Sequence, residues 1–368
     1  MTLDELRLHL NGLDRQLLEL IADRQRTSRE IARVKRATGH PTRDYARERD
    51  VIMGARARAA GLGVPEDVAE SVMRLLIRSS LTTQEQASVA AHGIGAGQRA
   101  LVIGGAGKIG GWFSAFLASL GFEVEVADPS AAPGPGVRAD WQAGPLDHDF
   151  IVVATPLGHT DAIRRELARA KPPGVVFDVG SLKSPLRGGL AELVKAGVRA
   201  TSVHPMFGPD TELLSGRHVI FIDLGAGDAL DRVRALFGST MVEQVVMGLE
   251  EHDRLIAYVL GLSHAVNIAF FTALAQSGET APRLVRMSST TFDAQFDIAS
   301  KVAQESPELY FEIQRLNDYG AESLEALERA VEALRAAVRS GDQAAFTALM
   351  RQGHEYTQGR RTVTQQRA

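Results

Sequence analysis

An arginine stands where an apolar residue is expected in the first helical segment of this chain. The apolar positions before it recur every three or four residues, as along the buried face of a long helix: Leu3, Leu6, Leu10, Leu13, Leu17 and Leu20. The next position in this series is Arg24. Because arginine stays charged and an unpaired buried charge is costly, we expect an anion beside Arg24.

Further polar residues in the same region could complete a pocket for that anion. At about 100° per residue, Arg24 and Lys35 lie within roughly 20° of each other, whereas Arg7 points about 100° away. Spacing also places polar groups on shared faces of two later helices: Asp44, Arg47 and Glu48 on one, Ser80 and Gln84 on the other. The set holds no nucleophile–base pair and suits binding a small dianion in one conformation. Solvated helix faces are the structural alternative.

A glycine-rich loop follows a short β-rich segment. Residues 105–110 have the pattern G-x-G-x-x-G, after ALVIG and before the helical stretch WFSAFLASL. A second strand-like segment ends at Asp128, which completes the context of a dinucleotide-binding loop. The carboxylate of Asp128 can accept hydrogen bonds from both ribose hydroxyls, which favours NAD over NADP. The loop residues assigned to the cofactor are Gly105, Gly107, Lys108, Ile109 and Gly110.

Two further residues end strand-like segments and could meet a substrate. His204 ends ATSVH, and the carboxyl end of a parallel strand faces the ligand crevice of such a sheet. A neutral His204 can take a proton from a substrate hydroxyl as hydride leaves the adjoining carbon. Ser181 follows the preceding strand and can bind that hydroxyl. A packed histidine at a turn and a serine helix cap are the alternatives. The acidic and histidine residues near 252–264 lack compact ligand spacing, so no metal site is predicted.

Three regions are expected to position these residues. Residues 1–88 should form an all-α domain with helices over about 3–38, 44–60 and 65–86, and residues 89–98 a glycine-rich linker. Residues 99–249 should form a Rossmann-type α/β domain with a parallel sheet, because strand-like and helical segments alternate there. Residues 250–360 should form a second all-α domain. The strands are expected at 100–104, 123–127, 150–155, 175–180, 200–204 and 219–224.

Composition narrows the class of protein further. The chain has 368 residues, a net charge of −4 and no cysteine, which excludes disulfides, thiolate metal sites and a cysteine nucleophile. We find no uninterrupted apolar run of about 18 residues and no signal-peptide pattern, so we expect a cytoplasmic protein without a membrane partner. Acidic residues are mixed through the arginine-rich helical arm, which disfavours nucleic-acid binding.

Residues 2 to about 86 resemble the all-helical chorismate mutase family. The matching stretches are LR at 6–7, LDRQLLELIADR at 13–24, Lys35, PTRDYARERD at 41–50 and SSLTTQ ending at Gln84. The resemblance implies active-site roles for Arg7, Arg24, Lys35, Asp44, Arg47, Glu48, Ser80 and Gln84. It also implies that Arg7 reaches the pocket of a second subunit, and that Lys35 and Gln84 act on the ether oxygen of chorismate.

Residues 100 to about 358 resemble prephenate dehydrogenase through GGAGKIGGWF, DVGSLKS, VHPMFGPD and EEHD. The fused order is similar to that of bifunctional enzymes of tyrosine biosynthesis. This implies NAD as cofactor, chorismate and prephenate as substrates, a homodimer and feedback by tyrosine. It implies that His204 hydrogen-bonds the ring hydroxyl of prephenate, while Ser181, Asp210, Asp253 and His264 line or support the site.

One position departs from the dehydrogenase pattern. The family often has an arginine for the substrate's side-chain carboxylate a few residues before a Ser/Asp-Pro pair, whereas this chain has Lys301 ahead of Ser306-Pro307. Lysine lacks the fork for bidentate binding, and Arg286 is the alternative. Two other functions remain open: a prephenate or arogenate dehydrogenase with a non-catalytic regulatory or dimerising arm, and an NAD-dependent enzyme acting on a hydroxy acid.

Overall fold

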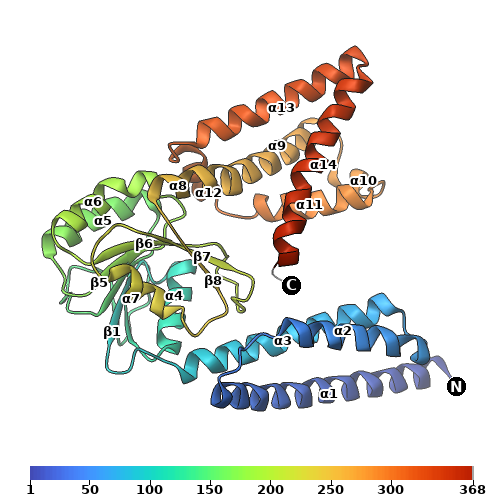
Figure 1. The fold of residues 1–368 in the computed structure, drawn as a ribbon, viewed down its shortest axis with the longest axis horizontal. Helices are drawn as coiled ribbons and strands as arrows, with labels where there is room; N and C mark the ends of the chain where they lie inside the picture. The colour runs from blue at the N-terminus through green and yellow to red at the C-terminus, as the bar shows by residue number, and fades with distance from the viewer. Residues whose placement is uncertain (367–368) are drawn as a thin grey trace.

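The computed structural model describes residues 1–366, in three parts that follow one another along the chain (Figure 1). The first part consists of α1 (Leu3–Thr38), α2 (Tyr45–Ala59), the short 3-10 helix η1 (Ala60–Leu62) and α3 (Glu66–Ala91). A capping box between Thr2 and Glu5 begins α1, and Gly39, in the left-handed conformation at φ 69°, ends it. The sequence predicts these boundaries closely.

The end of α3 differs from expectation. This helix continues to Ala91, so part of the segment expected as a linker is helical. The reason is local: residues 87–91 are ASVAA, and the glycines begin only at Gly93.

The leucine series of α1 is not buried within this chain. Leu6, Leu10, Leu13 and Leu17 are about half exposed, and the buried residues of α1 are Ser28 and Ala32. Within the domain, α1 contacts mainly α3, which leaves the other side of α1 uncovered. The expectation of a buried seam is therefore wrong for the single chain.

The second part is an eight-stranded sheet with the order β3-β2-β1-β4-β5-β6-β7-β8. Its strands are β1 (Arg99–Ile103), β2 (Glu123–Ala127), β3 (Val137–Arg138), β4 (Phe150–Val153), β5 (Val175–Asp178), β6 (Ala200–Pro205), β7 (His218–Ile222) and β8 (Glu243–Met247). All neighbours pair in parallel except β6 and β7, so the expected fully parallel sheet is mixed. The sequence analysis also missed β3, which has two residues, and β8, which is half-buried.

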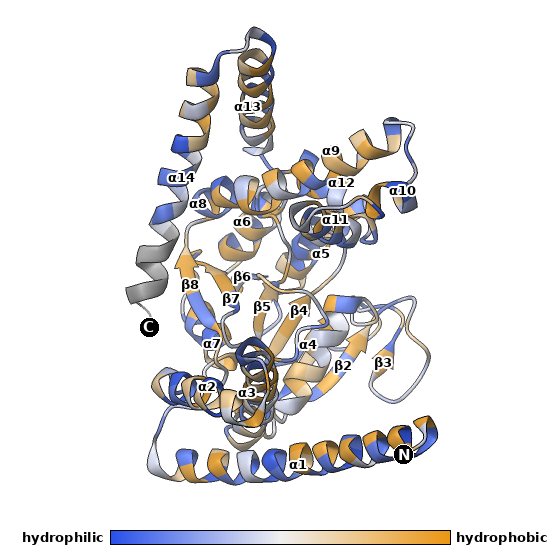
Figure 2. Ribbon diagram, turned by 90° about the vertical axis from the view of Figure 1, so that its right-hand side faces the viewer, coloured by the Kyte–Doolittle hydropathy of each residue, from blue (hydrophilic) through white to orange (hydrophobic). Residues whose placement is uncertain are grey.

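Helices cover both faces of this sheet, and the strands are apolar on both sides as a result (Figure 2). On one face, α4 (Lys108–Ser119) and α7 (Ala229–Leu236) pack Phe113 and Val233 into the cluster that contains Val102. On the other, α5 (Leu157–Ala170) and α6 (Arg187–Lys195) pack Leu167 and Leu193 with Leu101 and Ile103. The carboxyl ends of the parallel strands meet at one edge, which is where a ligand crevice forms.

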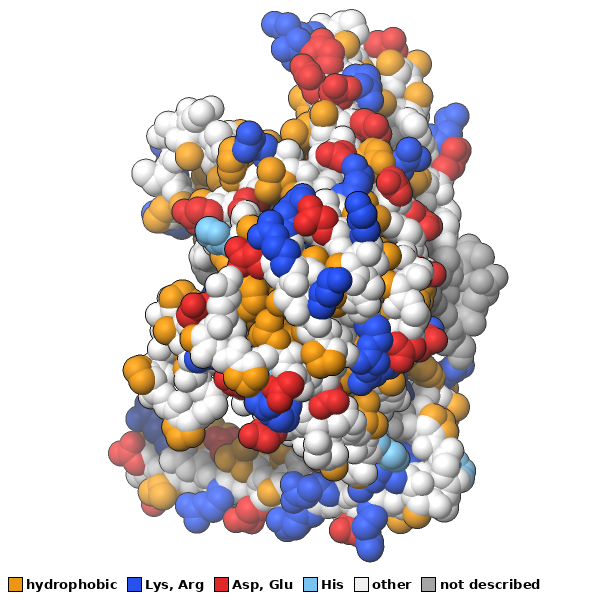
Figure 3. Space-filling view, turned by 90° about the vertical axis from the view of Figure 1, so that its left-hand side faces the viewer, with side chains coloured by type: hydrophobic (Ala, Val, Ile, Leu, Met, Phe, Trp, Pro, Cys, Tyr) orange, Lys and Arg blue, Asp and Glu red, His pale blue; other side chains and the backbone are white. Residues whose placement is uncertain are grey.

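The third part is helical, as expected. Its elements are α8 (Leu249–Ile256), the π-helix η3 (Ala257–Leu262), α9 (Ser263–Gln276), α10 (Ala281–Val285), α11 (Thr290–Ala303), α12 (Pro307–Arg315), α13 (Gly320–Ser340) and α14 (Gln343–Gln366). The short 3-10 helix η2 (Ser184–Leu186) links β5 to α6. Charges of both signs are interspersed over the face of the molecule in Figure 3, with no large patch of one sign.

One segment of the described chain, Leu249–Gln276, is long and apolar enough to cross a membrane by length and composition. The sequence analysis had found no run of this kind, because polar residues such as Ser263 and His264 interrupt the apolar stretch. The segment packs through η3 and α9 against α11 and α13, and it begins with buried His252 and Asp253. Core helices of water-soluble proteins pass the same test, so the segment is weak evidence of a membrane span.

Candidate active sites

A cavity of about 900 Å³ lies among α1, α2 and α3. It brings together seven of the eight side chains singled out in this region: Arg24, Lys35, Asp44, Arg47, Glu48, Ser80 and Gln84. Arg58 also lines it, and its spacing in the sequence carried no signal that would have separated it from other surface arginines. A volume of this size suits a small organic ligand.

Arg24 enters the cavity from α1 without a carboxylate partner among the described residues. Its guanidinium donates hydrogen bonds to the backbone oxygen of Leu76, at 2.6 Å, and to the hydroxyl of Ser80. Burial lowers the pKa of Arg24 from its ordinary value. Both acceptors are neutral, so the protein leaves this charge uncompensated and the cavity favours an anion.

The other polar groups of the cavity are held by neighbours on the same bundle. Lys35 Nζ donates to the backbone oxygen of Thr42 at 2.7 Å, and Gln84 Nε2 donates to Ser28 Oγ at 3.1 Å. Gln84 Oε1 is buried without a partner. Asp44 caps α2 through the backbone N–H of Arg47, at 2.9 Å. Lys35 and Gln84 each have one hydrogen bond from the side-chain nitrogen to the bundle and both line the cavity, so each nitrogen keeps donor capacity beyond that bond.

Glu48 and Arg7, two further residues predicted for the cavity, pair with charged side chains of their own chain. Glu48 accepts a bidentate pair of hydrogen bonds from Arg43, at 2.8 and 3.0 Å, so its carboxylate is fixed in place. Arg7 lies on the exposed part of α1 beside Asp4, with 3.5 Å between their charged groups, and it does not line the cavity of its own chain. Its position agrees with its angle on the helical wheel.

The glycine loop connects β1 to α4 in the geometry of an anion cradle. A Cβ at Gly110 would lie 2.1 Å from the backbone oxygen of Gly104, and one at Gly105 would lie 2.6 Å from Val126, so the backbone can pack this closely only with glycine. Helix α4 begins after Gly107 with no side-chain cap, which leaves its first N–H groups free for a phosphate. These features fit a dinucleotide.

Asp128 lies at the end of β2, beside this loop. Its two carboxylate oxygens accept hydrogen bonds from the backbone of Ala106, at 3.1 Å, and of Ser130, at 2.8 Å. A cavity of about 790 Å³ extends from this point between Gly107, Asp128 and Trp141. Of the residues predicted for the cofactor, Gly107 and Asp128 line this cavity.

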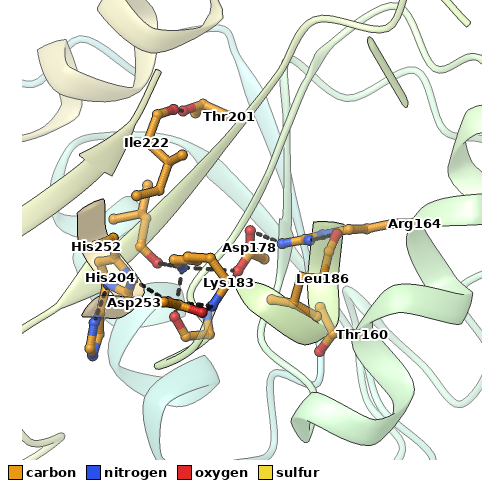
Figure 4. Close-up of polar contacts among 12 residues, drawn as sticks. Thr160, Arg164, Asp178, Lys183, Leu186, Thr201, His204, Ile222, His252 and Asp253 are labelled. Carbon is orange, nitrogen blue, oxygen red and sulfur yellow. Dashed lines mark hydrogen bonds and ion pairs between the residues drawn. The ribbon is translucent and has the colours of Figure 1, made fainter. Parts of the chain in front are cut away.

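His204 is the last residue but one of β6 and is buried, with 4% of its surface exposed. Its Nδ1 lies 2.9 Å from Nε2 of His252, and Nδ1 of His252 lies 2.6 Å from Oδ1 of Asp253 (Figure 4). Burial, together with the neighbouring His252 and Lys183, holds the pKa of His204 well below its ordinary value. His204 is therefore neutral at physiological pH and able to accept a proton.

Three comparisons with known proteins bear on these sites. Residues 6–85 match the family model of chorismate mutase type II. Residues 137–246 match the nucleotide-binding domain of prephenate dehydrogenase, and residues 249–352 match its dimerization domain. The chain belongs to the bifunctional chorismate mutase/prephenate dehydrogenases. The glycine loop and Asp128 precede the matched nucleotide-binding range, so their assignment rests on their own geometry.

Individual relatives of this mutase/dehydrogenase match most of the chain or a large part of it. The T-protein of Enterobacter agglomerans is 26% identical over 319 residues, which is 84% of this chain and 81% of that protein. The 4-amino-4-deoxyprephenate dehydrogenase of Streptomyces pristinaespiralis is 29% identical over 68% of this chain and 88% of its own length. Prephenate dehydrogenase from Aquifex aeolicus, solved with hydroxyphenyl propionate and NAD+, superposes with a TM-score of 0.54 at 20% identity, over 71% of this chain and 98% of that one. This last likeness shows a shared fold.

The structure places Asp253 and Asp210 in different surroundings. Asp253 is fully buried, and its carboxylate accepts hydrogen bonds from the backbone of Lys183, at 3.0 and 3.1 Å, and from Ser184. It therefore supports the site from within rather than binding substrate. Asp210 is exposed and lines a separate cavity of about 510 Å³ between α3 and α4, so its role beside the substrate stays a prediction from the resemblance.

Other predicted dehydrogenase residues are more peripheral. Ser181 is half-buried after β5. The ring of His264 lies against that of Tyr310, tilted by 31° with ring centroids 4.2 Å apart, and Nδ1 of His264 is buried without a partner among the described residues. Lys301 and Arg286 are both exposed, on α11 and after α10. No spacing pattern indicates that His252 contacts His204, because 48 positions separate the two residues.

Proposed function

We propose that the mutase cavity rearranges chorismate to prephenate and that the dehydrogenase site converts prephenate to 4-hydroxyphenylpyruvate with NAD. The two fused domains carry these activities in this family. What remains to be assigned is the role of each side chain, the substrate preference of the second site, and the assembly.

In the mutase cavity, Arg24 binds one carboxylate of chorismate, and Arg7 of a partner subunit binds the other. The observation that carries this assignment is the uncompensated charge of Arg24, whose hydrogen-bond acceptors are neutral. Lys35 and Gln84 donate to the ether oxygen, on which negative charge develops as its bond to the ring breaks and the new carbon–carbon bond forms. Glu48, fixed by Arg43, accepts the ring hydroxyl, and Asp44, Arg47 and Ser80 complete the wall.

In the dehydrogenase site, the glycine loop, the start of α4 and Asp128 would hold NAD, which would supply the hydride acceptor. The ring carbon of prephenate loses a hydride, and its hydroxyl becomes a carbonyl as the hydroxyl proton leaves. Carbon dioxide then departs, the electrons of its carbon–carbon bond make the ring aromatic and move onto the carbonyl oxygen, and this oxygen regains a proton to give the phenol. His204 takes the hydroxyl proton, and Ser181 binds the same hydroxyl. Support comes from the position of His204 at the carboxyl end of β6, on the same sheet edge as the end of β1 that carries the glycine loop.

Prephenate is our preferred substrate, and arogenate and 4-amino-4-deoxyprephenate are the alternatives to test, since relatives are named for each of them. Lys301 and Arg286 are the candidates for the substrate's side-chain carboxylate. Both are exposed, so closure of the site would have to bring one of them to the ligand. Feedback inhibition by tyrosine stays a prediction from the resemblance.

The proposed assembly is a cytoplasmic homodimer. The match to a dimerization domain and the apolar residues exposed on its helices, including Leu255, Val259 and Leu334, support pairing through the third part of the chain. We assign Leu249–Gln276 to this helical core, because its first turns hold His252 and Asp253 against the sheet domain. Fractionation of cells into soluble and membrane fractions tests the location.

The decisive experiment supplies chorismate and NAD to the pure protein and follows chorismate loss and NADH formation separately. Lys35→Ala should abolish chorismate loss, yet leave NADH formation from added prephenate intact. His204→Asn should do the reverse. If Lys35→Ala kept its mutase turnover, or His204→Asn its dehydrogenase turnover, the corresponding assignment would be wrong. The same assay with arogenate and the amino analogue fixes the substrate.

A further inference from the structure

Behind His204 lies a continuous chain of buried polar groups that the proposed reaction does not yet use. It runs from His204 on β6 to His252 and Asp253 on α8, and ends on the turn at Lys183 and Ser184 (Figure 4). His252 and Asp253 are both fully buried, so neither can touch a substrate directly. Their contacts with His204 must act through that residue.

The hydrogen bonds in this chain fix which nitrogen of each histidine carries a proton. Burial would raise the pKa of Asp253, but hydrogen bonds from His252 and Ser184 outweigh it and lower the pKa, so the carboxylate is ionised. An ionised carboxylate only accepts, so His252 Nδ1 carries the hydrogen toward it. Neutral His252 then has its lone pair on Nε2, and His204 must donate from Nδ1. The lone pair of His204 is thereby placed on Nε2, which has no hydrogen-bond partner among the described residues.

We propose that His252 and Asp253 form a proton relay behind His204. As hydride leaves the substrate, the hydroxyl proton moves to Nε2 of His204, and the proton on Nδ1 of His204 moves to Nε2 of His252. The positive charge then resides on His252, in contact with the carboxylate of Asp253, instead of on His204. This inference rests on the proposed role of His204 as the base.

The charges around the chain explain why a relay is favoured over protonation of His204 alone. His204 has no carboxylate of its own, and the buried ammonium of Lys183 opposes a second positive charge nearby. That ammonium donates to the backbone oxygens of Gly180, at 2.6 Å, and Val203, at 2.9 Å, and pairs with Asp178 at 3.4 Å. Arg164 pairs with the same Asp178 from α5. Asp178 thus has two cations of its own, which leaves Asp253 as the carboxylate for a proton arriving on His252.

The test is the dehydrogenase pH profile of His252→Gln. Glutamine can still accept a hydrogen bond from His204 through its side-chain oxygen, but it cannot take the proton. We expect kcat to fall by at least about tenfold, with KM for prephenate and NAD unchanged. The acid limb of kcat should move to lower pH, because the first proton then binds His204, whose site lacks a carboxylate. Asp253→Asn should move the limb in the same direction.

Controls separate a relay from a merely structural role and from failure of the base assignment. Mutase turnover in the same chain reports folding, and His218→Gln, an exposed histidine on β7 paired with Glu243, is the matched change that should leave both activities intact. A His252→Gln enzyme with wild-type kcat and an unmoved acid limb would overturn the relay. If His204→Asn retained dehydrogenase activity, the base itself would be misassigned.

A second measurement does not depend on any variant. With the chemical step rate-limiting, the wild-type rate plotted against the deuterium fraction of the solvent should be curved, because two protons move together. A straight line, which one moving proton gives, would refute the relay even if the His252 variants do not fold.

Discussion

At the scale of single residues, Arg24 lowers the stability of the empty protein and provides a binding site for an anion. It continues the leucine series of α1, yet its charge is half-buried against neutral acceptors. A buried charge without a counter-ion destabilises the empty protein, and a ligand carboxylate removes that penalty. The same residue therefore accounts for both the binding of an anion and an instability of the free cavity.

Replacing Arg24 separates these two effects. Arg24→Leu should leave the midpoint of thermal unfolding unchanged or higher, because an apolar side chain continues the seam. Mutase turnover should fall by about 10²-fold or more, and dehydrogenase turnover should not change. Calorimetry and the two assays measure this. A variant that unfolds more easily yet still turns over chorismate would show that Arg24 is structural.

Burial lowers the pKa of His204 and of its partner His252, and these two histidines together set the pH dependence of the dehydrogenase. The neutral pair accepts the substrate proton, so activity is present while both histidines are neutral and is lost once the pair binds a proton from solvent. Because both pKa values lie below the ordinary value of about 6.5, kcat/KM for prephenate should stay level as pH falls through 6.5 and decline only at more acidic pH. Stability follows the same sign: the buried neutral histidine stabilises above the unfolded pKa and ceases to as pH falls toward the folded one. A decline centred at or above 6.5 would contradict the assignment.

At the scale of elements, the sequence predicts whatever depends on local spacing. The three mutase helices, six of the strands and the glycine loop follow from periodicity and turn chemistry, and seven cavity residues follow from helix faces and family likeness. The remaining features depend on contacts between segments that are far apart in the sequence. The antiparallel β6–β7 pair, the short β3 and the contact of His204 with His252 join segments whose own residues carry no signal of their partner.

Helix α3 illustrates such a contact between distant segments, because it lines the mutase cavity and also packs against the dehydrogenase domain. Gln84 lines the mutase cavity, while the next residue, Glu85, is buried in the dehydrogenase domain. Its carboxylate accepts the backbone N–H groups of Leu214, at 2.7 Å, and Met241, at 2.5 Å. Arg43, which holds Glu48, donates in parallel to Ser215, at 2.7 Å. The dehydrogenase domain therefore helps to fix two walls of the mutase cavity.

Glu85→Ala should weaken the contact between α3 and the dehydrogenase domain. The change leaves two N–H groups without their acceptor, which costs about 2 kcal/mol in the free energy of unfolding. Mutase turnover should fall more than dehydrogenase turnover, because Gln84 lies on the same turn. Gln86→Ala, an exposed neighbour on α3, is the matched control. Denaturant titration measures the free energy of unfolding, and the two assays measure turnover. If Glu85→Ala and Gln86→Ala behaved alike, the contact between α3 and the dehydrogenase domain would have no role in mutase activity.

At the scale of the whole molecule, the single chain exposes apolar surfaces at both ends. The leucines of α1 are exposed at one end, and apolar residues of α9 and α13 at the other. A second copy can cover such self-complementary faces in an isologous dimer. Pairing along α1 would also bring Arg7, which lies outside its own cavity, toward the cavity of the partner.

Complementation between two inactive variants tests whether each mutase site uses both chains. Arg7→Ala removes the group donated to the partner, and Lys35→Ala removes a group of the chain's own cavity. If Arg7 acts across the interface, a mixed dimer has one site lacking both groups and one intact site. Random exchange of equal amounts should then restore about a quarter of wild-type mutase activity. If Arg7 served its own chain, both sites of the mixed dimer would lack one group and mixing would restore nothing, while dehydrogenase activity, unchanged in every sample, would confirm that the chains are folded.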